Sequence, residues 1–235
     1  MKNLMTLKIA IVFGILGIIG CAEVPQSDEA KVEPAKEVKE NMTNSQSTKS
    51  VVKDLPVKNL TVDIQNSIVS WIGTKPTKQH NGTINVQSGA LKVANNEIVA
   101  GEFVMDMKTV KVLDMDEENN KNLAGHLMSE DFFKSDQHPT AKFVITKVAP
   151  YKAKNGEKPL LRGTTHNITG NLTMLGNSNS ITFPAKVKIS EKGVKANANF
   201  NIDRTQWKVN YGSDQSLGNK FIKPTVNIGI VLQAN

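Results

Sequence analysis

The chain has 235 residues, of which 22% are charged and 5% are aromatic, and its formal net charge is +7. This length allows one large domain or two small ones, and the single cysteine excludes a fold held by internal disulfides. The lysines are scattered along strand-like segments. A nucleic-acid-binding protein would gather basic and aromatic residues in a stripe, so nucleic acid is not an expected partner.

Residues 1–21 have the pattern of an export signal. Lys2 and Lys8 precede an apolar run over residues 9–19, which is shorter than the about 20 apolar residues that a transmembrane helix needs. The run ends at Ile18-Ile19-Gly20-Cys21, which resembles the lipobox of bacterial lipoproteins, whose cysteine is acylated and becomes the new N-terminus. We therefore expect a lipoprotein signal peptide, lipidation of Cys21 and a membrane anchor. An ordinary secretory signal with a free thiol is the alternative.

Residues 22–58 combine prolines, many Glu and Lys residues and a polar tract over residues 41–50, without an aromatic residue. Such a composition buries too little apolar surface to offset the entropy of ordering, so we expect a disordered charged tether. Ala22 is not the aspartate that is associated with inner-membrane retention in some bacteria. We therefore expect the protein in the bacterial envelope, lipid-anchored in the outer membrane and facing the periplasm, with its domain over residues 59–235.

Apolar and polar residues alternate along the remainder of the chain, as in strands with one dry and one wet face. The pattern is clearest over residues 181–190, 194–203 and 226–232. Between the first two, Glu191-Lys192-Gly193 has the length of an antiparallel hairpin connection. Weaker patterns bring the expected number of strands to about nine, and they cover residues 61–64, 68–75, 82–93, 98–107, 141–148 and 164–175.

Residues 114–134 lack this alternation and are rich in Glu, Asn, Lys, Leu and Ala, which predicts a helix. Asp114 and Glu117 have the spacing of a capping box at its start. Leu123, Leu127 and Met128 would form its inward stripe, and a turn starting at Ser129 would carry Phe132 and Phe133.

Antiparallel strands with one helical insertion fit either a sandwich or a barrel, and a barrel is favoured because closure removes exposed strand edges. The sequence predicts an all-β fold with an antiparallel barrel of about eight strands. An interior of this size is either filled by side chains or wide enough for one small ligand.

Several stretches, in order and spaced along nearly the whole domain, resemble the YceI-like family. They are Trp71-Ile72-Gly73-Thr74-Lys75 with His80 and Gly82, Gly101-Glu102-Phe103-Val104-Met105-Asp106-Met107, Leu123-Ala124-Gly125-His126-Leu127, Asp131-Phe132-Phe133, Pro139-Thr140-Ala141-Lys142-Phe143, Thr169-Gly170-Asn171-Leu172-Thr173 and Ile202-Asp203-Arg204. The resemblance implies a lipocalin-like barrel capped by the helix, with a tunnel for polyisoprenoids or similar long amphiphiles in bacterial envelopes. The chain departs from the family's commonest form in its predicted anchor and in Trp207-Lys208, where a Phe-Gly pair is frequent.

The candidate lipid-binding residues are the apolar ones expected to face inward, together with one histidine and one arginine. They are Trp71, Phe103, Met105, Leu123, His126, Leu127, Phe132, Phe133, Phe143, Ile145, Leu172, Phe183, Phe200, Ile202 and Arg204. A dry tunnel alone can hold a long apolar chain, since each methylene contributes about 0.8 kcal/mol on leaving water. On composition alone, the same residues could instead fill a solid core.

His126 could fix the helix end or meet the polar end of a ligand, and Arg204 could pair with Asp203, Asp131 or another carboxylate, or grip a phosphate headgroup. His126, Ser129 and Asp131 also allow a hydrolase hypothesis, although no glycine elbow accompanies them. No catalytic residue is predicted. No metal site is expected either, because the four histidines lack metal-ligand spacing.

The sequence therefore predicts a non-enzymatic protein that binds a polyisoprenoid, an isoprenoid quinone or a fatty amphiphile for transport, storage or protection. Its partners would be this lipid and the membrane that holds its acyl anchor, and a homodimer is possible. No cofactor is expected beyond such a bound lipid. A ligand-free structural or stress-response module is the alternative, with a hydrolase on the same scaffold as a third hypothesis.

Overall fold

A computed structural model describes residues 22–37, 56–153 and 158–235. The predicted signal peptide with Cys21, and residues 38–55 of the predicted tether, lie outside this part of the chain. Among the described residues, no helix is long and apolar enough to cross a membrane.

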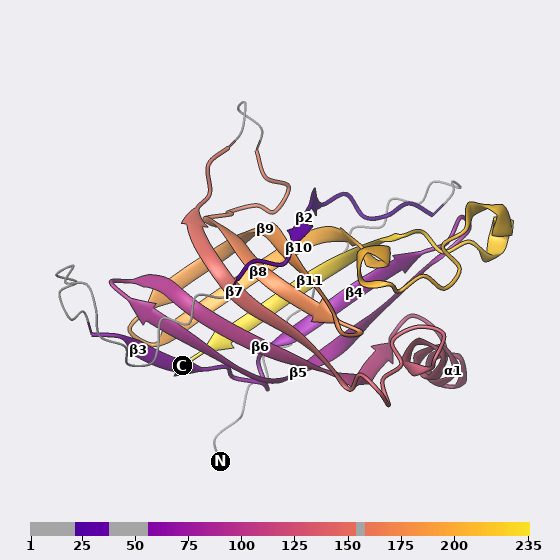
Figure 1. The fold of residues 1–235 in the computed structure, drawn as a ribbon, viewed down its shortest axis with the longest axis horizontal. Helices are drawn as coiled ribbons and strands as arrows, with labels where there is room; N and C mark the ends of the chain where they lie inside the picture. The colour runs from indigo at the N-terminus through magenta and orange to yellow at the C-terminus, as the bar shows by residue number, and fades with distance from the viewer. Residues whose placement is uncertain (1–21, 38–55, 154–157) are drawn as a thin grey trace, which may run out of the picture.

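Eight antiparallel strands form a closed barrel in which each strand pairs with the next along the chain and the last pairs with the first (Figure 1). These strands are β4 (Ile68–Thr74), β5 (Gln79–Ala94), β6 (Glu97–Val112), β7 (Thr140–Pro150), β8 (His166–Met174), β9 (Asn177–Ser190), β10 (Gly193–Asp203) and β11 (Thr225–Ala234). The predicted all-β fold, its antiparallel closure and, among the described residues, its single α-helix are confirmed. A short strand, β3 (Lys58–Thr61), pairs with β5 outside the eight.

Period-two alternation places the apolar side chains inside the barrel. On β9, Ile181 and Phe183 are 2% and 5% exposed, and on β10 Phe200 is 2% exposed. The polar residues between them face outward, because successive side chains of a strand point to opposite faces. The expected hairpin between β9 and β10 is formed, and Gly193 adopts a φ of +123° at its end.

Helix α1 (Glu117–Met128) lies at one end of the barrel and packs against β6 (Figure 1). Asp116 is its N-cap, and its carboxylate accepts a hydrogen bond from the Asn119 amide over 2.9 Å. The predicted cap at Asp114 is wrong, because that carboxylate binds β5 instead. It accepts a hydrogen bond from the Asn81 amide and pairs with the His80 ring.

A long connection between β10 and β11 includes the 3-10 segments η1 (Arg204–Trp207) and η2 (Gln215–Lys220). Trp207 is fully buried there, and its Nε1 donates to the Leu172 carbonyl oxygen over 2.8 Å. Trp207 thereby attaches this connection to the barrel end that α1 also covers.

Residues 22–37 lie against the barrel wall, so the prediction of disorder is wrong for this part of the tether. Two short strands, β1 (Asp28–Glu29) and β2 (Lys31–Pro34), pair with β10 in parallel and with β9 antiparallel. The physical reason is that β9 and β10 pair with each other over only part of their length. Their unpaired edges can bind a segment that is too polar to build a core of its own. We call residues 25–36 the strap.

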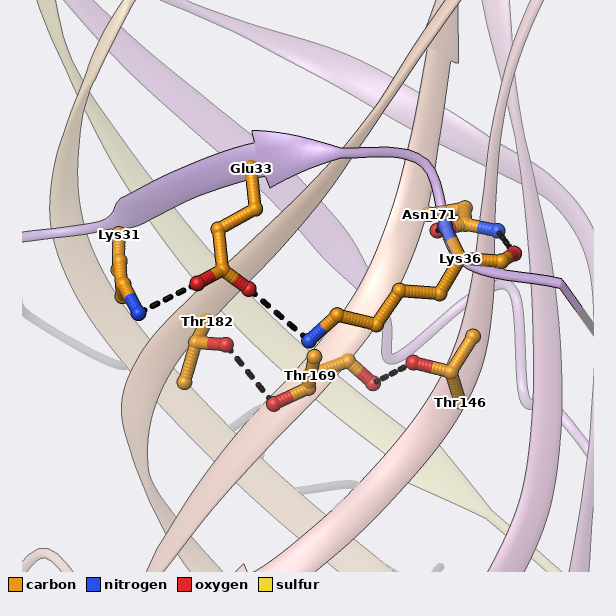
Figure 2. Close-up of polar contacts among 7 residues, drawn as sticks. All are labelled: Lys31, Glu33, Lys36, Thr146, Thr169, Asn171 and Thr182. Atoms are coloured by element: carbon orange, nitrogen blue, oxygen red, sulfur yellow. Dashed lines mark hydrogen bonds and ion pairs between the residues drawn. The ribbon is translucent and has the colours of Figure 1, made fainter.

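Glu33 of the strap lies between Lys31 and Lys36 and forms ion pairs with both, the second over 3.0 Å (Figure 2). These two lysines lower the pKa of Glu33 from 4.5 to about 2. A depressed carboxyl pKa contributes stability that is present above the ordinary value and is lost as the pH falls toward the folded value. Both ion pairs lie within the strap, so protonation of Glu33 should slightly loosen the ordered conformation of residues 31–36 between pH 4.5 and about 2.

Hydrogen exchange measured by mass spectrometry checks this expectation. Amide protection over residues 31–36, compared with that of β5, should fall as the pH drops through this window. In a Glu33→Gln variant the protection should be lower at neutral pH and should change less with pH. Equal pH profiles in the two proteins would contradict the assigned role of Glu33.

Candidate functional site

The barrel encloses an apolar cavity of about 540 Å³. This volume lies in the range of about 300–1,000 Å³ that is typical of ligand pockets. All eight barrel strands contribute lining residues, as do α1 and the connection between β10 and β11. On β5 the lining extends from His80 to Leu91, about 36 Å along the strand, so the cavity is long as well as apolar.

Every predicted lipid-binding residue lines this cavity. They come from β4 (Trp71), β6 (Phe103, Met105), α1 (Leu123, His126, Leu127), the turn after α1 (Phe132, Phe133), β7 (Phe143, Ile145), β8 (Leu172), β9 (Phe183), β10 (Phe200, Ile202) and η1 (Arg204). The solid-core alternative expected these side chains to leave no internal space, and the cavity argues against it. Contact of these residues with a lipid stays a prediction.

Four phenylalanine rings form one continuous aromatic wall of the cavity. The ring centroids of Phe103 and Phe143 lie 6.4 Å apart, those of Phe143 and Phe183 lie 5.7 Å apart, and Phe183 stacks on Phe200 at 4.1 Å. The rings come from β6, β7, β9 and β10, so the wall crosses half the circumference of the barrel. Such a surface offers apolar contact without a hydrogen-bonding demand.

At the helix end of the cavity, the ring of His126 lies nearly perpendicular to two aromatic rings. Its centroid lies 5.3 Å from that of Phe132 and 4.9 Å from that of Tyr211. Its Nδ1 is 3.7 Å from an Asp131 carboxylate oxygen. His126 therefore packs at the end of the cavity that α1 covers.

Ser129 does not contact the His126 ring as a nucleophile would. Its hydroxyl donates to the main-chain carbonyl oxygen of His126 over 2.8 Å, which closes the C-terminal end of α1. A serine nucleophile needs a base within hydrogen-bond distance of its hydroxyl. The hydrolase hypothesis gains no support from this geometry.

Arg204 is 6% exposed and directs its guanidinium at main-chain carbonyl oxygens. It donates to the carbonyls of Lys223, Val209, Tyr211 and Ile222, which occupies four of its five N–H groups. Burial lowers its pKa, and the charge of Asp203 opposes that shift. The structure therefore favours the structural role of Arg204. Asp203, one of the carboxylates expected to pair with Arg204, accepts hydrogen bonds from the amide and hydroxyl of Thr205.

Trp71 lies across the inner face of β4, against Gly82 of β5. A Cβ added at Gly82 would lie 2.6 Å from the indole ring, so this close approach requires glycine. The indole Nε1 is buried and has no hydrogen-bond partner among the described residues.

Across residues 22–37, 56–153 and 158–235, no three His, Cys, Asp or Glu side chains lie close enough together to hold a metal ion.

Sequence reasoning missed other lining residues. Leu91, Ile98, Val194 and Leu232 lie toward the end of the barrel opposite α1, and Val86 lies opposite Met105; strand alternation could have indicated all five. Tyr211 and Ile222 come from the connection between β10 and β11, and no periodic pattern marks them.

An antiparallel eight-stranded barrel with an apolar cavity and a helix at one end defines a lipocalin-like barrel. The YceI-like domain model matches residues 60–234, and the chain belongs to this family. A search of curated proteins found no match.

Two solved structures share the fold. Burkholderia cenocepacia BcnA is 21% identical, with a TM-score of 0.56 over 74% of this chain and 99% of its own. A polyisoprenoid binding domain from Saccharophagus degradans, implicated in plant cell wall breakdown, is 12% identical, with a TM-score of 0.53 over 77% of this chain and 99% of its own.

Proposed function

We propose that the protein binds one long-chain apolar lipid inside its barrel. The observation that carries this proposal is the elongated apolar cavity of about 540 Å³. A fold of this size could have filled its interior with side chains, as small barrels often do. An apolar cavity of this volume favours an apolar occupant, because the lining gains dispersion contacts when the space is filled.

The lining favours a chain-like ligand with a small polar end. Apolar side chains dominate along the strands, whereas Lys75, Lys78, His80, Asn119 and Asn122 belong to the part of the lining near α1. Each methylene of such a chain contributes about 0.8 kcal/mol on entering the cavity. The polar end would then lie near α1 while the tail extends toward the opposite end.

The ligand class that we propose is a polyisoprenoid, an isoprenoid quinone or a fatty amphiphile, and the polyisoprenoid binding domain from Saccharophagus degradans supports it. Its role would be transport, storage or protection of that lipid in the bacterial envelope. The lipobox-like sequence at Cys21 supports an acyl anchor, which we place in the outer membrane facing the periplasm.

A chain-length series tests this proposal. Isoprenoid alcohols of increasing length are titrated into the protein, and quenching of tryptophan fluorescence is followed, with Trp71 in the cavity lining as the expected reporter. Each added unit buries several carbons and should contribute more than about 1.4 kcal/mol, which lowers Kd about tenfold or more. The gain should stop once the tail fills the cavity.

The plateau distinguishes the cavity from general hydrophobic adhesion. Binding to an exposed apolar surface would continue to strengthen with length and would saturate above one ligand per chain. An affinity independent of chain length would contradict the proposal.

A further inference from the structure

The barrel wall has a seam between β9 and β10. These strands pair from Ser190 opposite Gly193 to Ala185 opposite Ala198, and there the pairing stops. The next residue of β9 is Pro184, which has no N–H group to donate to a neighbouring strand. Beyond this point each strand presents a free edge.

The strap occupies the seam. Its β2 pairs with β9 from Lys31 opposite Thr182 to Pro34 opposite Asn179, and its β1 pairs with β10 at Asp28 opposite Phe200. Figure 1 shows this indigo segment lying along β9 and β10 on the outside of the barrel. One short segment thus supplies both of the strand neighbours that the two edges lack.

The residues behind the strap belong to the cavity wall. Ala30 and Val32 of the strap pack against the buried apolar cluster that includes Ile181, Phe183 and Phe200. These three residues also line the cavity. The strap therefore completes the barrel wall beside residues that line the cavity.

Two asparagines of the barrel hold the strap near its ends. Asn201 donates to the Pro25 carbonyl oxygen over 3.2 Å and to a Glu29 carboxylate oxygen over 2.9 Å. Asn171 accepts from the Lys36 amide over 2.9 Å and donates to the Lys36 carbonyl oxygen over 2.6 Å, as Figure 2 shows in part. If the strap left, water could replace it at Asn171 and Asn201, so these side chains would stay hydrogen-bonded.

The strap is held more weakly than the strands around it. None of its residues is fully buried, whereas β9 and β10 each carry several buried side chains. Its ion pairs join Lys31, Glu33 and Lys36 to one another and not to the barrel strands. Segments with few buried apolar contacts are the first to open in a native protein.

From this geometry we propose that the strap is a removable part of the barrel wall, and that the lipid enters and leaves sideways through the seam beneath it. This inference rests on the proposed lipid binding. A long tail that left end-on would have to slide past α1, Phe132 and Tyr211. A lateral opening lets the whole tail cross the wall at once.

The family model begins at residue 60, so the strap is an addition to the shared domain. It also follows directly on the predicted lipidation site at Cys21 in the sequence. In the anchored protein the strap would be the ordered part of the chain that leads to the membrane. A lipid released beneath it would emerge close to that attachment.

An engineered disulfide that joins the strap to β9, and that can be reduced again, tests the inference. Lys31 and Thr182 are cross-strand partners, and such pairs have Cα separations suited to a disulfide. The full chain with Lys31→Cys and Thr182→Cys is loaded with a fluorescently labelled isoprenoid alcohol, oxidised, and mixed with excess phosphatidylcholine vesicles. We expect release to slow at least about tenfold and to recover when the disulfide is reduced.

The matched control is a disulfide between β10 and β11, which pair along nearly the whole length of β10. Lys195 and Gln233 are cross-strand partners on β10 and β11, and a disulfide between them should leave the release rate unchanged. Single-cysteine variants account for any contribution from Cys21. Equal release from the oxidised and reduced strap variant, or equal slowing by the control disulfide, would overturn the strap proposal. Failure of every variant to load the probe would instead overturn the proposed lipid binding.

Discussion

Replacing Ala198 by tryptophan should reduce the affinity for a long isoprenoid alcohol by at least about tenfold. Ala198 is the middle residue of β10 and lines the cavity, where the four-ring aromatic wall reaches this strand. An indole there would occupy the space that the tail needs, and a loss of a few buried methylenes is worth more than tenfold in Kd. Because the new ring enters an existing cavity, the free energy of unfolding should change by less than about 3 kcal/mol.

The matched control is Lys195→Trp on the same strand. Lys195 is exposed and faces outward, so the same added ring should leave the affinity unchanged. Fluorescence titration measures both variants, and urea unfolding confirms that each is folded. Unchanged binding in a folded Ala198→Trp protein would mean that the ligand does not occupy the barrel.

Replacing Arg204 by methionine should lower the free energy of unfolding more than any other substitution proposed for this protein. The substitution retains an apolar stem but removes the donors from four main-chain carbonyls, those of Lys223, Val209, Tyr211 and Ile222. Leaving a buried polar group unsatisfied costs about 1–3 kcal/mol; the Val209 carbonyl is buried and the other three are partly buried, so their contributions add to it. We expect the free energy of unfolding to fall by about 3 kcal/mol or more.

Urea denaturation measures this loss, and two variants show where it comes from. Arg204→Lys keeps the charge but not the planar fork, so it should lose nearly as much stability. Arg162→Met removes an exposed arginine and should change stability by less than about 0.5 kcal/mol. If Arg204→Met were as stable as Arg162→Met, the carbonyl contacts would not hold the connection between β10 and β11.

The strands were predictable because their local pattern and their tertiary environment agree. Ile181, Phe183 and Phe200 alternate with polar residues, and the barrel buries one face and solvates the other. The composition of residues 114–134 predicted the helix, and the family resemblance added its position at the barrel end and the tunnel. The predicted lining residues followed from the strand alternation and the resemblance together. Whether that lining encloses space could not be read from composition, since the same residues would also pack a solid core.

The strap was not predictable from its own residues. Pro25, Lys31 and Glu33 are typical of disordered segments, and nothing in residues 22–37 indicates a partner. Its order depends on Pro184, which ends the pairing of β9 with β10, and on asparagines more than a hundred residues away in sequence.

The N-cap of α1 was predicted at the wrong residue for a related reason. Asp114 and Asp116 are equally suited to cap α1, and the contacts of Asp114 with β5 decide between them.

Native mass spectrometry of the full chain, purified from a bacterial envelope without detergent, tests the central claim most directly. Lipid binding predicts one additional mass per chain, and extraction should identify it as an isoprenoid or another long-chain lipid. A folded protein that carries no lipid, and that takes up none when incubated with an envelope lipid extract, would contradict the account.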